Sequence, residues 1–149
     1  MLHANADQRI LGYLGRALSL EFSAVQQYST QARLVSAWGL SEAAKRLQQE
    51  ATEEMGHVES IISRMLALGV APNASQLRPV KLGQNLIECL QHDHTFENDI
   101  VTLYADAARY CESKGDHDNR LFFATLLDEE KAHGQELAQW IRELEQTGN

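Results

Sequence analysis

The sequence lacks the features that mark membrane proteins and nucleic-acid-binding proteins. No run of about eighteen or more apolar residues is present, so we predict no membrane partner. With 13 lysines and arginines against 21 aspartates and glutamates, the net charge of −8 would repel phosphates, and we predict no nucleic-acid partner. The first residues carry neither the basic start nor the apolar segment of a secretory signal, so we expect a cytoplasmic location.

Cysteine and proline are scarce, with two of each. Cys89 and Cys111 lie 22 residues apart in one predicted helix, which separates them by roughly 33 Å at ~1.5 Å per residue. That distance is too long for a disulfide, so both are predicted to be small buried or half-buried thiols. Runs of β-branched residues with a period of two are also absent, which argues against a β-sheet protein.

Apolar residues recur instead at the three- and four-residue spacing of amphipathic helices. Turn and capping residues divide this pattern, with Gly39 before Ser41 at one joint and Gly115 before Asp116 or Asp118 at another. A chain of 149 residues has the size of one domain. We predict a single all-α domain, residues 1–149, with helices at about 7–37, 41–69, 83–113 and 117–146.

The connection between the second and third predicted helices is longer than the other two and contains both prolines. About 13 residues long, it reaches ~43 Å when extended, close to the ~45 Å length of a helix of about 30 residues. It can therefore run the length of the bundle and make the second and third helices parallel. Two antiparallel helical hairpins joined by one long crossover form a ferritin-like four-helix bundle, which is the predicted fold.

Acidic and imidazole side chains interrupt the apolar stripe of every predicted helix. Because an isolated buried carboxylate is costly, several of them facing one interior require a compensating cation. The set comprises Glu21, Glu54, His57, Glu97, Glu130 and His133.

The spacing within this set occurs twice. In each half of the chain a lone glutamate is followed after 33 residues by the glutamate, and after 36 by the histidine, of a Glu-x-x-His pair. Positions three apart share one helix face, and all six side chains fall near the middle of the bundle. Solvated helix faces or a merely polar core would require this repeated spacing to be accidental.

Four carboxylates and two imidazoles suit two iron ions per subunit, for which manganese or zinc can substitute. Hard oxygen ligands supply the charge, two glutamates can bridge, and positions remain open for dioxygen. This ligand set is the one that helical bundles use for di-iron and di-manganese sites. Other clusters fit solvation better: residues 92–94 (His-Asp-His) and 115–118 are predicted to be surface or helix-start residues, whereas Glu50 and Glu53 could face an iron access route.

The chain resembles the bacterioferritins from about residue 8 to residue 146. The similar stretches are LEFSAVQQY around Glu21, AWGL at the first turn, EEMGH at residues 53–57, APN at the start of the crossover and LLDEEKAH on the last helix. The resemblance implies that Glu54 and Glu130 bridge two irons, with Glu21 and His57 completing one iron and Glu97 and His133 the other. It further implies that Tyr28 donates a hydrogen bond to a site carboxylate.

The resemblance also implies an activity and an assembly. Fe(II) would be oxidised by dioxygen or peroxide, which makes the chain a ferroxidase, and Fe(III) would be stored as mineral. Storage would occur inside a homo-oligomer, at least a twofold dimer and up to 24 subunits, with haem b shared by paired subunits. A ferredoxin-type electron donor is a further implied partner.

Met55 follows Glu54 by ~100° of helix rotation, so it should point sideways when Glu54 points inward. Thioethers suit haem iron, and two symmetry-related methionines could supply both axial ligands. By itself, a methionine at such a position is more often an interface filler. With the resemblance we expect Met55 to be the axial ligand and Phe22 and Val25 to contact the ring. A mid-helix Gly56 suggests close approach of a partner helix or a flat ring.

Bacterioferritins normally carry a short fifth helix, and no such segment follows the fourth predicted helix here. An open assembly such as a dimer is therefore the alternative to a cage. In that alternative, a non-storing dimeric di-iron or haem protein reduces peroxide or oxygen or transfers electrons. Residues Gln49, Ile61 and Glu136 also replace groups often found in the family for electron relay and mineral nucleation.

Overall fold

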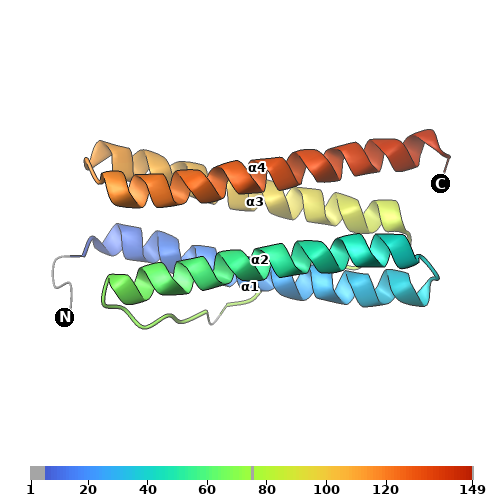
Figure 1. Ribbon diagram of the computed structural model, residues 1–149, viewed down its shortest axis with the longest axis horizontal. Coiled ribbons are helices and arrows are strands. Elements are labelled where there is room, and N and C mark those ends of the chain that lie inside the picture. The colour runs from blue at the N-terminus through green and yellow to red at the C-terminus, as the bar shows by residue number, and fades with distance from the viewer. Residues whose placement is uncertain (1–5, 75, 149) are drawn as a thin grey trace.

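Four long helices account for most of the chain. The structure is a computed structural model, and it describes residues 6–74 and 76–148. The helices are α1 (Gln8–Ala37), α2 (Ser41–Ala67), α3 (Leu86–Ser113) and α4 (His117–Gln146), and they lie along one common direction (Figure 1). Strands are absent from this described part of the chain.

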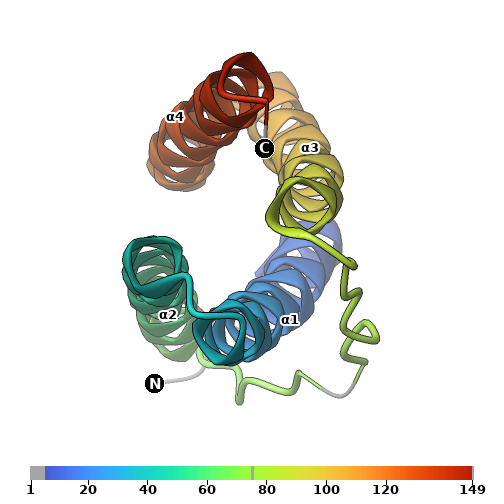
Figure 2. The same cartoon turned by 90° about the vertical axis from the view of Figure 1, so that its right-hand side faces the viewer.

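The helices form two antiparallel hairpins. α1 packs against α2, α3 packs against α4, and the hairpins meet where α1 contacts α3. In the view down the bundle the helices follow one another around a ring in the order α2, α1, α3 and α4, so that α4 faces α2 (Figure 2). α2 and α3 run in the same direction, and the described residues 68–74 and 76–85 of their connection run along the outside of the bundle. The predicted all-α arrangement of two hairpins and one long crossover is confirmed.

Two predicted helix boundaries differ from the structure. α2 ends at Ala67 rather than at residue 69, because Gly69 has a left-handed φ of 79°. α3 begins at Leu86 rather than at residue 83, because the Asn85 side chain caps it by accepting from Glu88 N at 2.9 Å. Gly83 instead folds back on the first turn of α3, where an added Cβ would lie 2.6 Å from Glu88 Cβ.

The predicted capping by Ser41 is also wrong. The N-cap of α2 is Leu40, which has no polar side chain, and Ser41 is already the first helical residue. At α4 the structure selects Asp116, whose side chain accepts from Asn119 N at 3.1 Å. These differences move helix ends by a few residues and leave the middle of the bundle in register.

The crossover is tied to α1 by a row of polar side chains at four-residue intervals. Ser23 Oγ accepts from Arg78 N at 2.9 Å, and Gln27 Oε1 accepts from Lys81 N at 3.0 Å. Gln31 Nε2 donates to Lys81 O at 3.3 Å. These bonds satisfy backbone groups that secondary structure leaves unpaired, and so they hold the crossover that makes α2 and α3 parallel.

Large apolar side chains fill both ends of the bundle, and the polar groups are buried between them. Leu14, Leu47 and Phe123 are fully buried, as are Ile61 and Ile100. Both cysteines lie on α3 as buried free thiols, as their separation predicted. None of the described helices combines the length and the apolar character needed to cross a bilayer.

Candidate metal centre

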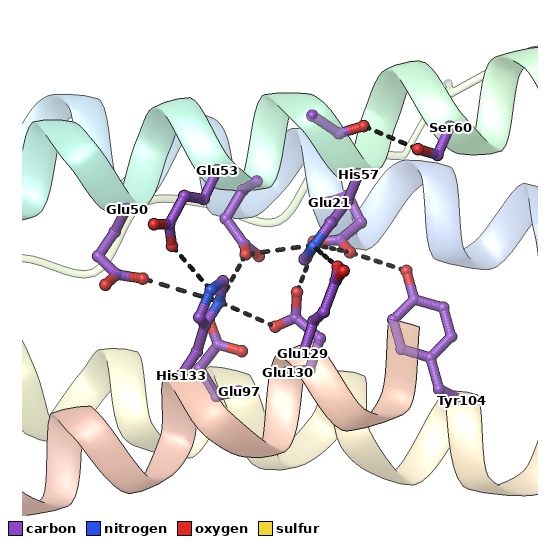
Figure 3. A network of polar contacts seen from close by, with 12 residues as sticks. Glu21, Glu50, Glu53, His57, Ser60, Glu97, Tyr104, Glu129, Glu130 and His133 are labelled. Carbon is purple, nitrogen blue, oxygen red and sulfur yellow. Dashed lines mark hydrogen bonds and ion pairs between the residues drawn. The ribbon is translucent and has the colours of Figure 1, made fainter. Parts of the chain in front are cut away.

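The six predicted site residues meet at mid-bundle. Five of them are labelled in Figure 3: Glu21, His57, Glu97, Glu130 and His133. α1 and α3 each contribute one glutamate, whereas α2 and α4 each contribute a glutamate and a histidine one turn apart. Their side chains form two groups in which the potential ligand atoms lie within 4.8 Å of one another. The groups share two carboxylates; they are Glu21, Glu54, His57 and Glu130, and Glu54, Glu97, Glu130 and His133.

Both histidines turn Nδ1 into this cluster. His57 Nδ1 lies 3.1 Å from Glu21 Oε2 and 2.6 Å from Glu130 Oε1. His133 Nδ1 lies 3.0 Å from Glu54 Oε1 and 3.8 Å from Glu130 Oε2. The rings stack at a centroid distance of 5.8 Å, so the two imidazoles stand side by side over the shared carboxylates.

The other ring nitrogen of each histidine is held by an outer carboxylate. His57 Nε2 lies 2.7 Å from Glu129 Oε2, and His133 Nε2 lies 2.8 Å from Glu53 Oε2. A carboxylate on the outer nitrogen favours a proton there and leaves Nδ1 with a lone pair for a metal. Glu53 and Glu129 therefore set the tautomer that a metal site needs.

Two tyrosines orient the terminal glutamates across the hairpins. Tyr28 of α1 donates to Glu97 Oε1 of α3 at 2.8 Å, and Tyr104 of α3 donates to Glu21 Oε2 of α1 at 2.8 Å. Each bond leaves the second carboxylate oxygen free to face the cluster. The two phenols therefore fix the carboxylates that are not shared.

Tyr104 and Glu129 were not predicted as site residues, although the sequence carries a signal for both. The second set of expected ligands follows the first by 76 residues, and the same offset relates Tyr28 to Tyr104 and Glu53 to Glu129. The repeat therefore extends beyond the ligands to their hydrogen-bond partners.

The carboxylate oxygens and imidazole nitrogens of the six site residues suit cations as ligands. Within the described chain no lysine or arginine pairs with the cluster, and most of its oxygens lack a donor of good geometry. Buried carboxylates without partners are costly unless a cation compensates them. The buried atoms that lack a hydrogen bond of good geometry include Glu21 Oε1, both oxygens of Glu54, Glu97 Oε2, both oxygens of Glu130 and His133 Nδ1.

Protons and one imidazolium balance part of this charge. Burial raises the pKa of Glu54 well above its ordinary value, and the negative charges of Glu21 and Glu97 raise it further. Burial opposes the charge of His57, but hydrogen bonds to Glu130 and Glu21 outweigh it and raise the pKa of His57 to about 11. Burial also opposes ionisation of Glu130, but hydrogen bonds with Glu97, His57 and Glu54 lower its pKa to about 2. Divalent cations would replace these protons.

Access to the cluster lies between α2 and α4. A cavity of about 500 Å³ there is lined by both site histidines and by Glu53, Glu129 and Glu136. Gly56 lines the same cavity, and a Cβ added to it would meet nothing within 4 Å. Among the described residues none makes the close approach expected at Gly56, and its bare backbone borders the acidic opening.

Comparison with known proteins agrees with this geometry. The ferritin-like domain family matches residues 11–147. A bacterioferritin of Rhodobacter capsulatus is 37% identical over 127 residues, which cover 85% of this chain and 79% of the relative. The chain belongs to the bacterioferritin family.

Further matches extend over most of the bacterioferritin fold. A bacterial ferritin of Neisseria meningitidis serogroup A is 32% identical over 143 residues, covering 95% of this chain and 92% of the relative. A solved structure of the Rhodobacter capsulatus bacterioferritin has a TM-score of 0.91 at 35% identity and covers 95% of this chain and 88% of that one. It is described with a metal-free dinuclear site and a haem iron. The ferritin-like fold is thus confirmed, in a family of iron-storage ferroxidases.

The residues expected around haem lie outside the metal cluster. Met55 is 38% exposed on α2, so its thioether is accessible at the bundle surface. Phe22 and Val25 are partly buried on α1 and pack against the core. The bacterioferritin resemblance, rather than a contact within one chain, connects these three residues with haem.

One polar residue assigned to the surface is instead buried beside the cluster. Asp93 is 1% exposed, and its Oδ1 accepts from Gln27 Nε2 at 3.0 Å. Glu50, which was expected to face an access route, lies 3.7 Å from His133 Nδ1. Asp93 lies between His92 and His94, and a run of three polar residues is typical of an exposed segment. The one sequence feature that indicates the inner face of the helix is its position one turn before Glu97.

Proposed function

We propose that the chain is a ferroxidase, which oxidises Fe(II) at this centre and passes Fe(III) to storage. The observation that carries the proposal is the pair of four-residue groups sharing two fully buried carboxylates. Two adjacent cation positions allow two Fe(II) to release two electrons together, which reduce dioxygen to peroxide or peroxide to water.

Each residue has a definite role in this proposal. Glu54 and Glu130 bridge the two positions, Glu21 with His57 completes the first, and Glu97 with His133 completes the second. Tyr28 and Tyr104 hold the unshared carboxylates, while Glu53 and Glu129 hold the outer Nε2 atoms and so direct each imidazole Nδ1 toward the cation position. Manganese or zinc would occupy the same oxygen and nitrogen ligands, and zinc would do so without being oxidised.

The acidic opening between α2 and α4 provides the proposed route for Fe(II). Its carboxylates Glu53, Glu129 and Glu136 surround the path to the two histidines. A cleft lined by one sign of charge concentrates ions of the opposite sign. Fe(II) would thus reach the cluster without crossing the apolar ends of the bundle.

Storage and haem binding complete the proposal. A homo-oligomer of up to 24 subunits would retain the mineral, and a twofold dimer would place two Met55 side chains on one haem b between Phe22 and Val25 of both subunits. Support comes from the bacterioferritin relatives and from the accessible thioether of Met55. A cytoplasmic location and a ferredoxin-type electron donor belong to the same proposal.

The decisive experiment supplies Fe(II) in air and measures particle mass, iron per subunit and the rate of Fe(II) oxidation. The wild-type chain should form large particles holding far more than two irons per subunit. Glu54→Gln should abolish rapid oxidation, whereas Glu42→Gln, an exposed change on the same helix, should oxidise Fe(II) at the wild-type rate. About two irons per subunit on a dimer would favour the non-storing alternative, and rapid oxidation by Glu54→Gln would refute the centre.

Haem has a separate test. Reconstitution with haem b should give a Soret band with one haem per two subunits, and Met55→Leu should lose the spectrum of a thioether-ligated iron. A wild-type chain that takes up no haem would remove Met55, Phe22 and Val25 from the cofactor site without affecting the ferroxidase.

A further inference from the structure

The two halves of the centre have identical ligands but different surroundings. Applying the offset of 76 residues to the buried and partly buried polar residues near the centre yields apolar partners in four cases. The pairs are Asp93 with Ala17, Gln27 with Leu103, Gln31 with Ala107 and Glu50 with Leu126. In all four pairs the polar member lies on one side of the centre, the side formed by Glu97 and His133.

Among the described residues outside the six ligands, buried atoms that lack a hydrogen-bond partner are also found on this side of the centre and not on the other. Apart from atoms of the six ligands, the unpartnered buried side-chain atoms of the described residues are Asp93 Oδ2, Glu50 Oε2 and Gln31 Oε1. All three are oxygens, and two of them belong to carboxylates. The opposite side offers only alanine and leucine at the related positions.

Contacts place these groups next to the half formed by Glu97 and His133. Asp93 precedes Glu97 by one turn on the same face of α3. Glu50 joins Glu53 and His133 in a third group whose ligand atoms lie within 4.8 Å of one another, and no related group exists at His57 among the described residues. After burial and Glu97, the charge of Asp93 is the next cause that raises the pKa of Tyr28, the phenol bound to Glu97.

The groups that α1 and α2 place around Asp93 are polar or acidic rather than basic. α1 supplies the Gln27 amide at 3.0 Å and Gln31, and α2 supplies the charge of Glu50. The nearest crossover contact is indirect, because Lys81 engages Gln27 through its backbone nitrogen. The negative charge of Asp93 is therefore left to act on whatever cation occupies the neighbouring half.

We propose that the centre is functionally asymmetric, with Asp93 and Glu50 making the Glu97–His133 half the tighter cation position. The first divalent cation binds there, and the Glu21–His57 half is filled second and released first. Asp93 and Glu50 are positioning residues in this inference, since they act on the cation through their charge and through the ligand shell. The inference rests on the proposed two-cation centre.

The test uses Zn²⁺ and full-length variants that each retain one half. His57→Ala leaves the Glu97–His133 half, and His133→Ala leaves the Glu21–His57 half. Zn²⁺ affinities are measured with a competing metal indicator at pH 8, above the pKa of about 7 to which burial raises Asp93. His57→Ala should bind Zn²⁺ more tightly than His133→Ala, by about tenfold or more.

Second substitutions then assign the cause. Adding Asp93→Asn to His57→Ala should weaken Zn²⁺ binding about tenfold, and adding it to His133→Ala should change binding less than about twofold. Glu50→Gln should show the same selectivity from a different helix. Asp106→Asn, which removes an exposed charge from α3, is the matched control and should affect neither half.

The outcomes separate this inference from the proposed function. Equal Zn²⁺ affinities of the two single-half variants, or an equal loss in both on Asp93→Asn, would overturn the asymmetry while leaving the centre intact. Two-step Co²⁺ spectra of Asp93→Asn and Glu50→Gln alone supply the same comparison if a histidine variant does not fold. Failure of the wild-type chain to bind Zn²⁺ or Co²⁺ would instead refute the two-cation centre itself.

Discussion

The two tyrosines of the centre should contribute unequally to the stability of the metal-free protein. Tyr28 is the one hydrogen-bond donor that the described structure provides for Glu97, whereas Glu21 accepts from Tyr104 and also contacts His57 Nδ1 at 3.1 Å. Replacing Tyr28 by phenylalanine therefore leaves a buried carboxyl without a donor. The same change at Tyr104 leaves Glu21 with one partner.

The expected magnitudes follow from this difference. Stranding a buried polar group costs roughly 1–3 kcal/mol, whereas losing one of two hydrogen bonds costs about 1 kcal/mol. Both phenols are at least 98% buried, and phenylalanine keeps the ring, so packing does not distinguish the two changes. We expect Tyr28→Phe to lower the free energy of unfolding by about 2 kcal/mol and Tyr104→Phe by about 1 kcal/mol.

Urea unfolding followed by far-UV circular dichroism, at pH 7 with a chelator and one fixed protein concentration, measures these values. Tyr13→Phe is the matched control: its hydroxyl accepts only a 3.4 Å bond from Arg9, and the change should cost less than about 0.5 kcal/mol. A cost for Tyr104→Phe equal to or larger than that for Tyr28→Phe would refute the assignment of donors.

Two further predictions concern pH and the acidic opening. The folded state raises the pKa of Glu54, so this group stabilises the fold at pH values below its ordinary pKa of about 4.5 and loses that contribution as pH rises. His57, whose pKa is raised to about 11, is fully stabilising below about pH 6.5 and loses its contribution as pH rises toward 11. Glu130, with a pKa of about 2, acts oppositely and loses its contribution as pH falls below 4.5. Metal-free protein should therefore lose stability between pH 5 and pH 8, and saturating Zn²⁺ should reverse the slope; a flat profile in chelator would contradict the burial of charge. Gly56→Ala should raise the free energy of unfolding by about 1 kcal/mol, as should Gly134→Ala on α4, because neither added Cβ meets another atom; a loss of stability at Gly56 alone would reveal a close contact from a second subunit.

The sequence predicted the hairpins and the six inward side chains because both depend on periodicity. The repeated spacing of 33 and 36 residues does not depend on where a helix begins or ends. The wrong start predicted for α3 therefore did not change the grouping of Glu97 with Glu130 and His133. Residues that orient the ligands were harder to find, because a tyrosine on an apolar stripe such as Tyr104 looks like ordinary core. Only the offset between the two halves distinguishes it.

Asp93 was misjudged for a different reason. A run of three polar residues suggests a solvated face, and only the packing of α1 against α3 shows that the middle one is enclosed with Gln27. At Gly56 the placement of α2 and α4 leaves the backbone bordering their groove, where an added Cβ would meet nothing within 4 Å, so close approach of a partner helix or a flat ring stays a prediction. Both are properties of helix placement, which sequence periodicity leaves open.

The connection between the hairpins accounts for three of the four unequal pairs around the centre, those of Gln27, Gln31 and Asp93. Two hairpins need only one crossover, and it lies against α1, where Gln27 and Gln31 bind the Lys81 backbone. Gln27 accepts from Lys81 through Oε1 and donates from Nε2 to Asp93, so a polar group is enclosed beside Glu97. No crossover lies against the related positions of α3, Leu103 and Ala107, and the chain keeps them apolar. A duplicated ligand set in a single chain therefore acquires unequal surroundings because only one of its two hairpins holds the crossover.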